Sequence, residues 1–373
     1  MLGRMSSSEY YANIFFIINK RRRQVPASVE HLLFPIDNFL KFVIINILDF
    51  YNEVIMSKKY AFLFPGQGAQ APGMAKDIAE SFPAAKKVID DVSAITGLDM
   101  SKLLWESTQE DLSRSDNSQI AITAASLATM AALKEKGIEP SSAMGFSLGE
   151  FPALYAAGVL SFEDVVKVVR QRGLIMQKVC EEIAAKNEGR APGMTAVLGL
   201  SPDKVKEIVE PIEDAYAANM NSVKQTVVSG TFDALDKVEA AAKEAGARRA
   251  VRLKVAGPFH SPLMQAAAVE FEKFLADVKF NDPKIHLFSN VIGGKVIDGD
   301  QAKKAAVLHL THPVLWTDEE ACLAGVIKED GIENSAVLEV GPGKVLAGLW
   351  SQTEFGAGIA ATPVNTAETI NTL

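Results

Sequence analysis

Two patterns of apolar and polar positions alternate along most of the chain. Residues 60–64 form a short apolar run closed by a Pro-Gly pair, which is typical of a buried strand. Residues 120–136 are rich in alanine and are followed by a glycine, which predicts a helix. A predicted strand over 142–146 and a predicted helix over 148–157 come next. Strands that alternate with helices predict a parallel sheet with helices on both faces.

A different order of elements is predicted between residues 193 and 255. The expected strands are 194–200, 214–221, 225–229 and 248–255, and the expected helices follow Ser201 and Thr231. This βαββαβ order is that of a ferredoxin-like unit. We therefore expect a large α/β-hydrolase-like domain with a parallel sheet, formed by 56–190 and 256–373. An inserted ferredoxin-like subdomain is expected over 191–255.

Residues 1–55 differ in composition from the rest of the chain. They are rich in Ile, Phe, Asn and Tyr, contain a run of three arginines and have no glycine after Gly3. Met56 then opens a sequence that reads like a protein start. We interpret residues 1–55 as an extension that is dispensable for activity, produced by an upstream start codon chosen in error. A genuine accessory segment is the alternative.

Composition and charge narrow the function classes. The 373 residues are 48% hydrophobic and 23% charged, which is ordinary for a globular protein. A net charge of -8 argues against a nucleic-acid partner, which would require a basic face. The two cysteines, Cys180 and Cys322, are far apart, so we expect a reduced, cytoplasmic protein without disulfides or a thiolate metal site. No segment reads as a signal peptide or a membrane span, so no membrane partner is expected.

The strongest chemical feature is the G-x-S-x-G sequence at residues 145–149, where a predicted strand passes into a helix. Glycines permit the sharp turn that projects the Ser147 hydroxyl from the carboxyl edge of a sheet. The helix N-terminus behind it offers free N–H groups and a positive dipole end to a developing oxyanion. An ordinary strand-to-helix loop that contains a serine is the alternative. Residues 64–70, with two glycines, form a further turn whose N–H groups can complete an oxyanion hole, and a purely structural turn is the alternative.

A serine nucleophile needs a base, and the chain has five histidines, His31, His260, His286, His309 and His312. His31 lies in the extension, and His286 sits inside an apolar strand and reads as a core residue. His260 lies in a loop that leaves the predicted strand 248–255, and catalytic groups collect in such loops. Spacing favours His260 only weakly over His309 or His312. Arg172 reads as part of a solvated helix face unless the substrate carries a carboxylate.

Together these motifs resemble the malonyl-CoA:acyl carrier protein transacylases of bacterial fatty acid synthesis. The resemblance covers Met56 to the C-terminus. It rests on FPGQGAQ at 64–70, GFSLGE at 145–150, QRG at 171–173, GPFHSPLM at 257–264, HPVLW at 312–316 and EVGPGKVL at 339–346. It implies transfer of a malonyl group from malonyl-CoA to the phosphopantetheine thiol of acyl carrier protein. No bound cofactor or metal is implied.

The resemblance also implies roles for individual residues. Ser147 is similar to the family nucleophile and His260 to its base, in a Ser-His dyad that acts by a ping-pong scheme. Arg172 is similar to the residue that binds the malonyl carboxylate. The substrate-binding positions implied beside it are the oxyanion-hole N–H groups of Gln67 and Leu148, and Asn221 in the cleft between the two domains. Phe259 is similar to the malonyl-selecting form.

Two positions depart from the family pattern. Phe146 stands where members usually carry His, and Leu315 where many carry Gln or Asn. The resemblance implies that a backbone carbonyl from position 315 orients His260, so the second departure is expected to be tolerated.

Two other functions remain open at the level of the sequence. A serine hydrolase would share the nucleophile turn, and a catalytically inert homologue would only dock the carrier protein. Arg170, Lys178 and Arg248 are candidates for docking an acidic carrier.

Overall fold

The computed structural model describes residues 58–187 and 189–373. The predicted extension, 1–55, and His31 within it lie outside the described residues.

A six-stranded sheet forms the centre of the large domain, with the strand order β10-β9-β1-β2-β7-β8. The strands are β1 (Lys59–Phe64), β2 (Pro140–Gly145), β7 (His286–Ser289), β8 (Gly294–Lys295), β9 (Ser335–Val340) and β10 (Ala361–Val364). Every neighbouring pair from β10 to β7 is parallel, and only β7 and β8 pair antiparallel. The predicted parallel sheet is therefore confirmed.

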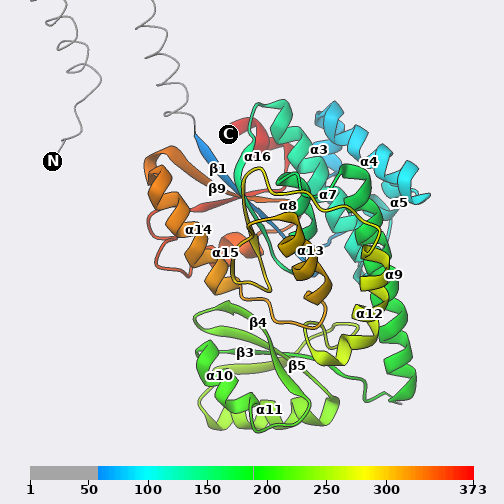
Figure 1. The fold of residues 1–373 in the computed structure, drawn as a ribbon, viewed down its shortest axis with the longest axis vertical. Coiled ribbons are helices and arrows are strands. Elements are labelled where there is room, and N and C mark those ends of the chain that lie inside the picture. Colours follow the sequence, from blue (N-terminus) through cyan, green and yellow to red (C-terminus); the bar gives the residue numbers. More distant parts are fainter. Residues whose placement is uncertain (1–57, 188) are drawn as a thin grey trace, which may run out of the picture. The chain divides into compact units, whose positions relative to one another are not determined.

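Helices cover both faces of this sheet (Figure 1). They are α3 (Lys76–Ser81), α4 (Pro83–Thr96), α5 (Met100–Trp105), α6 (Gln109–Ser113), α7 (Ser115–Glu135), α8 (Glu150–Ala156), α9 (Phe162–Lys186), α12 (Gln265–Leu275), α13 (Gly299–Leu308), α14 (Trp316–Asp330), α15 (Val345–Trp350) and α16 (Ala367–Thr372). Alternate side chains of β1 enter different cores. Phe62 and Phe64 pack with α4, α7 and α9, whereas Leu63 packs with Trp316 and Trp350 on the opposite face.

A second, four-stranded sheet has the order β4-β5-β3-β6, and all of its pairs are antiparallel. Its strands are β3 (Gly193–Leu198), β4 (Ala215–Ser222), β5 (Gln225–Gly230) and β6 (Arg249–Arg252), and its helices are α10 (Pro202–Val209) and α11 (Phe232–Glu244). Ser201 and Thr231 cap the two helices, as their positions predict. The βαββαβ order is the predicted ferredoxin-like unit.

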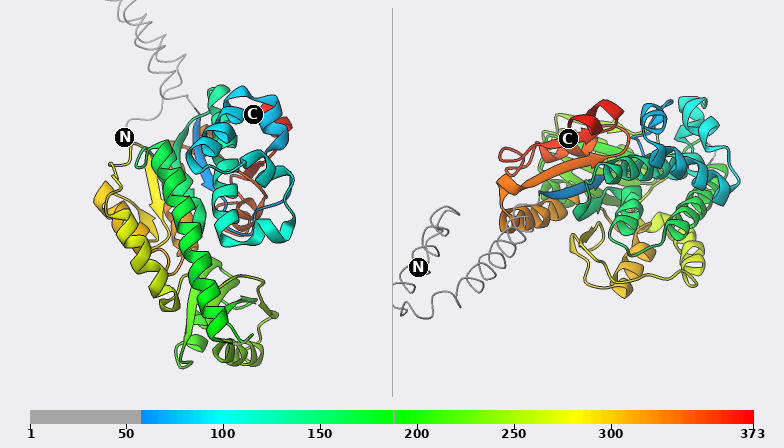
Figure 2. Two further views of the ribbon diagram at one scale, coloured as in Figure 1. Left: turned by 90° about the vertical axis from the view of Figure 1, so that its right-hand side faces the viewer. Right: turned by 90° about the horizontal axis from the view of Figure 1, so that it is seen from above.

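Backbone hydrogen bonds join the two sheets' domains beside β4. The Val314 N–H donates to Ala218 O at 2.8 Å, and the Met220 N–H donates to Val314 O at 3.0 Å. Figure 2 shows α9 running from the large domain to the smaller sheet. These connections hold one face of β4 over the carboxyl ends of the large sheet's strands.

One sequence-based interpretation of a core residue is wrong. His286 is exposed because it is the first residue of β7, and the buried part of that apolar run begins at Leu287. In addition, no helix in the described part of the chain is long and apolar enough to cross a membrane.

Candidate active site

The turn between β2 and α8 holds Ser147 in a left-handed conformation, with φ of 51°. Close backbone approaches explain the glycines on either side. A Cβ at Gly145 would lie 1.9 Å from Gly149 O, and a Cβ at Gly149 would lie 2.0 Å from Phe64 O. Only glycine fits either position, so the chain can reverse sharply here and present the serine hydroxyl.

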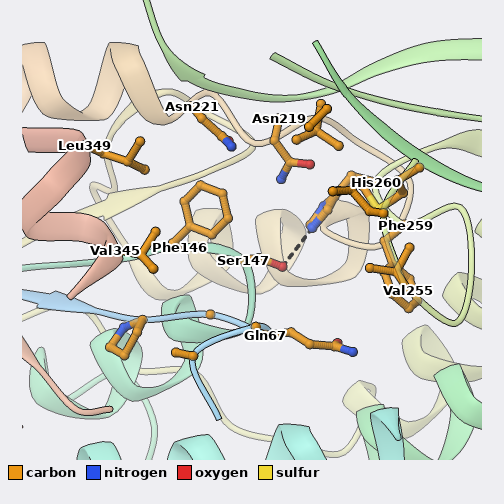
Figure 3. Close-up of a pocket in the computed structure, with 18 of the residues that line it drawn as sticks. Gln67, Phe146, Ser147, Asn219, Asn221, Val255, Phe259, His260, Val345 and Leu349 are labelled. Atoms are coloured by element: carbon orange, nitrogen blue, oxygen red, sulfur yellow. Dashed lines mark hydrogen bonds between the residues drawn. The ribbon is translucent and has the colours of Figure 1, made fainter. Parts of the chain in front are cut away.

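Ser147 and His260 form a hydrogen-bonded pair. Ser147 Oγ lies 2.8 Å from His260 Nε2 (Figure 3). His260 comes from the loop between β6 and the short 3₁₀ helix Pro262–Met264, and it also has a positive φ, of 58°. Two segments separated by more than a hundred residues therefore converge on one hydroxyl, in the geometry of a nucleophile and its general base.

The other ring nitrogen of His260 is held by backbone carbonyls. His260 Nδ1 donates to His309 O at 2.9 Å and to His312 O at 3.2 Å. The expectation that the carbonyl of position 315 orients His260 is therefore wrong. Helix α13 ends at Leu308, and carbonyls at and beyond a helix C-terminus lack partners within the helix, so this turn supplies the acceptors. A proton on Nδ1 leaves Nε2 free to accept the serine proton.

Burial keeps His260 neutral. Burial and, to a smaller extent, the positive charge of Arg172 lower the pKa of His260 to about 4, although the hydrogen bonds to the His309 and His312 carbonyls oppose the shift. His260 is thus in its base form at neutral pH.

Arg172 lies in the wall behind the pair and is not on a solvated helix face. It is 1% exposed, donates to Gln119 Oε1 and lies 3.2 Å from His309 Nδ1 through Nη2. Burial lowers the pKa of Arg172 to about 9, and the nearby Glu150 carboxylate partly offsets this effect, so the guanidinium is charged at neutral pH. Gln119 in turn donates to Gln67 Oε1 at 3.2 Å, which connects Arg172 to the cavity lining.

A cavity of about 280 Å³ opens in front of Ser147 and His260. Its polar lining includes Gln67, Asn219 and Asn221, of which the last two lie on the same face of β4. Figure 3 shows Asn219 and Asn221 on the far side of the cavity from Gln67. The Asn221 Oδ1 atom is buried and has no hydrogen-bond partner among the described residues. The structure therefore brings both domains to the site.

The remaining wall of the cavity is apolar. Phe146 packs edge-on against Trp316, with ring centroids 5.3 Å apart, and it lines the cavity with Val345 and Leu349 (Figure 3). Phe259 lines it beside His260. The family departure at position 146 thus replaces a polar ring with an apolar surface directly beside the nucleophile.

The oxyanion-hole candidates flank Ser147. Gln67 lines the cavity, whereas the side chain of Leu148 is fully buried. Leu148 lies in the first turn of the 3₁₀ helix Ser147–Gly149, where N–H groups have no partner within the helix.

A buried polar cluster beneath the turn escaped the sequence reasoning. Asn290 Oδ1 accepts from the Ser147 N–H at 2.7 Å, and Asn290 Nδ2 donates to Gly145 O at 2.7 Å and to Glu319 Oε1 at 2.8 Å. Glu150 Oε2 accepts from the Asn290 N–H at 2.8 Å, and burial raises the pKa of Glu150 to about 7. Asn290 directly follows β7, and a polar residue at the carboxyl end of a parallel strand was the available signal.

The three basic residues predicted to dock an acidic carrier lie outside the cavity lining. Arg170 donates to Asp116 O, and Lys178 pairs with Glu270, while Arg248 is exposed. None of the three lines the cavity. Among the described residues, no group of three or more His, Cys, Asp or Glu side chains is placed to hold a metal ion.

Known proteins are similar to this chain in sequence and fold. Residues 61–353 match the family described as acyl transferase domain. The chain is 37% identical over 295 residues to the malonyl CoA-acyl carrier protein transacylase of Bacillus subtilis, covering 78% of this chain and 89% of that protein. It is 36% identical to the protein of the same name from Escherichia coli K12, covering 78% and 91%.

Solved structures agree with these relatives. A malonyl-transacylase in complex with its type II polyketide synthase acyl-carrier protein superposes with a TM-score of 0.76 at 31% identity, covering 84% of this chain and 98% of that chain. The malonyl CoA-acyl carrier protein transacylase of Coxiella burnetii superposes with a TM-score of 0.76 at 32% identity, covering 85% and 97%.

Proposed function

This chain belongs to the acyl transferase family, and we propose that it transfers the malonyl group of malonyl-CoA to the phosphopantetheine thiol of an acyl carrier protein, supplying extender units for fatty acid synthesis. The relatives named malonyl CoA-acyl carrier protein transacylase, each matching 78% of the chain, support these substrates. The chain is accordingly an acyltransferase. We expect it to need no bound cofactor.

The proposed reaction has two halves. In the first, Ser147 Oγ attacks the thioester carbonyl of malonyl-CoA while His260 Nε2 takes the hydroxyl proton. The tetrahedral intermediate collapses, and CoA leaves as a thiol that receives this proton. In the second half, His260 takes a proton from the carrier thiol, the sulfur attacks malonyl-Ser147, and the proton returns to Ser147 Oγ. The 2.8 Å separation and the neutral ring of His260 support this ping-pong scheme.

Two further groups stabilise charge in this proposal. The N–H groups of Gln67 and Leu148 bind the oxyanion, and each donor of this kind contributes about 3 kcal/mol in comparable sites. Arg172 binds the malonyl carboxylate. Its buried Nε has no hydrogen-bond partner among the described residues, which leaves a donor for a charged ligand. Because Gln119 stands between Arg172 and Gln67, the carboxylate must displace or join the Gln119 amide.

The observation that carries the proposal is the Ser147–His260 pair at a cavity lined by both domains. Asn219 and Asn221 offer it amide groups suited to a polar substrate arm.

Malonyl-CoA supplied without carrier protein separates a transferase from the rival hydrolase. We expect a rapid release of about one equivalent of CoA per active site, followed by a stall, because water is a poor acceptor for a transferase. Adding carrier protein with a free phosphopantetheine thiol should restart the release. Ser147→Ala provides the background rate. Continuous CoA release without carrier would assign the site to a hydrolase, and carrier binding without any acylation would favour an inert docking protein.

A further inference from the structure

The imidazole of His309 lies at the centre of the buried polar cluster. It is 1% exposed and contacts two side chains through its two nitrogens. Arg172 Nη2 lies 3.2 Å from Nδ1, and Asn290 Oδ1 lies 3.1 Å from Nε2. The ring also stands edge-on to the rings of Phe151 and His260, and Glu150 Oε2 lies 3.5 Å from Nε2. These contacts to both nitrogens and to the ring hold the imidazole in one orientation.

These contacts determine where the proton on His309 sits. A guanidinium can only donate, so Nδ1 must accept from Arg172 and the proton must be on Nε2. Nε2 then donates to Asn290 Oδ1, and the Asn290 amide is oriented correctly because its nitrogen donates to Gly145 O. Burial and the charge of Arg172 lower the pKa of His309 well below its usual range, in agreement with a neutral ring.

Both members of the Ser-His pair connect to this one residue. Asn290 Oδ1, which accepts from His309, also accepts from the Ser147 N–H at 2.7 Å. The His309 carbonyl accepts from His260 Nδ1 at 2.9 Å, and His260 Nε2 lies 2.8 Å from Ser147 Oγ. The hydrogen bonds thus form a closed ring that passes through Ser147, Asn290, His309 and His260, with Arg172 attached at His309.

We propose that His309 is a positioning residue that fixes the nucleophile and its base relative to each other and holds Arg172 against the same unit. The proposal has two parts. The first, called the ring portion, concerns the closed ring of hydrogen bonds and is independent of the acyl group transferred. The second, called the Arg172 portion, concerns the placement of Arg172 and rests on the proposed function. Removing the imidazole leaves the hydrogen bond between the His309 carbonyl and His260 intact. It takes away the acceptor that holds Arg172 and one of the two donors to Asn290 Oδ1. A glutamine can restore both contacts, because its amide carries an acceptor and a donor.

The ring portion is tested by the rate at which a small fluorophosphonate labels Ser147, since this reagent carries no carboxylate. We expect His309→Leu to slow labelling by roughly tenfold or more, a part of the about 10²- to 10⁴-fold that a positioned base contributes. His309→Gln should return most of that loss. The matched control is His286→Leu at the exposed histidine, which should label at the wild-type rate. If the leucine variant does not fold, His309→Asn, whose amide is too short to reach Asn290, takes its place in the labelling test.

The Arg172 portion is tested by the ratio of Ser147 acylation rates with malonyl-CoA and acetyl-CoA. A purely structural loss would lower both rates equally. We expect His309→Leu to lower the malonyl-to-acetyl ratio by about tenfold, since Arg172 loses an acceptor that orients it, and His309→Gln to restore the ratio. Wild-type labelling in folded His309→Leu, or a glutamine variant no better than leucine, overturns the proposal. Slow labelling with an unchanged malonyl-to-acetyl ratio would support the ring portion of the proposal and refute the Arg172 portion. A wild-type protein that is labelled rapidly but takes up no malonyl group would refute the proposed function. The ring portion would still be tested by the labelling rates of the His309 variants.

Discussion

Arg172 is a cation with almost no exposed surface, and such a group is costly to bury unless its donors find acceptors. Gln119 and His309 meet two of its nitrogens, but Nε has no partner among the described residues. A carboxylate ligand would complete this set and would lower the desolvation cost of the arginine.

Arg172→Ala is therefore expected to discriminate between acyl groups. Acylation of Ser147 by malonyl-CoA should fall by roughly 10- to 100-fold, since a hydrogen bond to a charged group contributes about 1.5–3 kcal/mol. Acylation by acetyl-CoA should be unchanged or faster. Single-turnover rates from intact mass give both numbers, with Arg170→Ala on the same helix as the matched control. An equal loss on the two substrates would refute the assigned role.

The depressed pKa of His260 has a direct consequence for pH dependence. The neutral ring is the base, so activity persists as pH falls until it approaches the folded pKa, about 4. We expect fluorophosphonate labelling of Ser147 to be constant from pH 8 to pH 5 and to fall below that. A histidine with the ordinary pKa of about 6.5 would already have lost roughly 30-fold at pH 5.

Circular dichroism at each pH separates this effect from unfolding. A midpoint near pH 6.5 would contradict a buried, neutral His260.

At the scale of elements, the strand–turn–helix unit around Ser147 depends on glycines that touch backbone. The contact between Gly149 and Phe64 O ties the turn to β1, the central strand next to β2. The turn geometry is therefore set by packing between neighbouring elements as well as by local φ and ψ.

Gly149→Ala should disturb both folding and catalysis. Its Cβ would overlap the Phe64 carbonyl, so we expect a loss of about 1–3 kcal/mol in unfolding free energy. Acylation should fall by roughly 100-fold, the cost of displacing a reacting group by about 1 Å. Gly325→Ala in α14 is the control, because a Cβ there meets nothing within 4 Å and should stabilise the helix by up to about 1 kcal/mol. Chemical denaturation and acylation rates measure both variants. Wild-type values for Gly149→Ala would contradict the close contact.

Elements and their order could be predicted because they depend on local patterns. Apolar runs of strand length, glycines at helix ends and Ser or Thr caps were enough to predict both the parallel sheet and the βαββαβ unit. Boundaries were less exact: the strand expected over 248–255 is only Arg249–Arg252, and α7 begins at Ser115. The polar first turn of α7 lacks the alanines on which the prediction relied.

Residues that depend on distant segments could not be placed from the sequence. Asn290 and Glu319 carry no motif, yet they hold the Ser147 turn because β7 pairs with β2 and α14 packs against β7. Local spacing favoured His260 only weakly over His309, because the contacts that distinguish the two rings come from distant segments. The His260 ring reaches Ser147, whereas the His309 ring meets Arg172 and Asn290. The burial of Arg172 likewise follows from the packing of α9 against α7, which no window of sequence contains.

At the scale of the whole described unit, the cavity exists because two domains face each other. Ser147 and Gln67 come from the large domain, and Asn219 and Asn221 come from β4 of the ferredoxin-like subdomain. The hydrogen bonds between Val314 and the β4 backbone fix this edge of the subdomain over the nucleophile. The site therefore lies at a domain junction, which is a preferred place for ligand pockets.

The central claim is that Ser147 carries the acyl group between these substrates. Intact mass spectrometry of the chain mixed with malonyl-CoA tests it most directly, followed by addition of a carrier protein with a free phosphopantetheine thiol. The account predicts one malonyl adduct per chain, absent in Ser147→Ala, that disappears as malonyl-carrier forms. An adduct that persists in Ser147→Ala, or malonyl-carrier formed with no adduct on the chain, would contradict it.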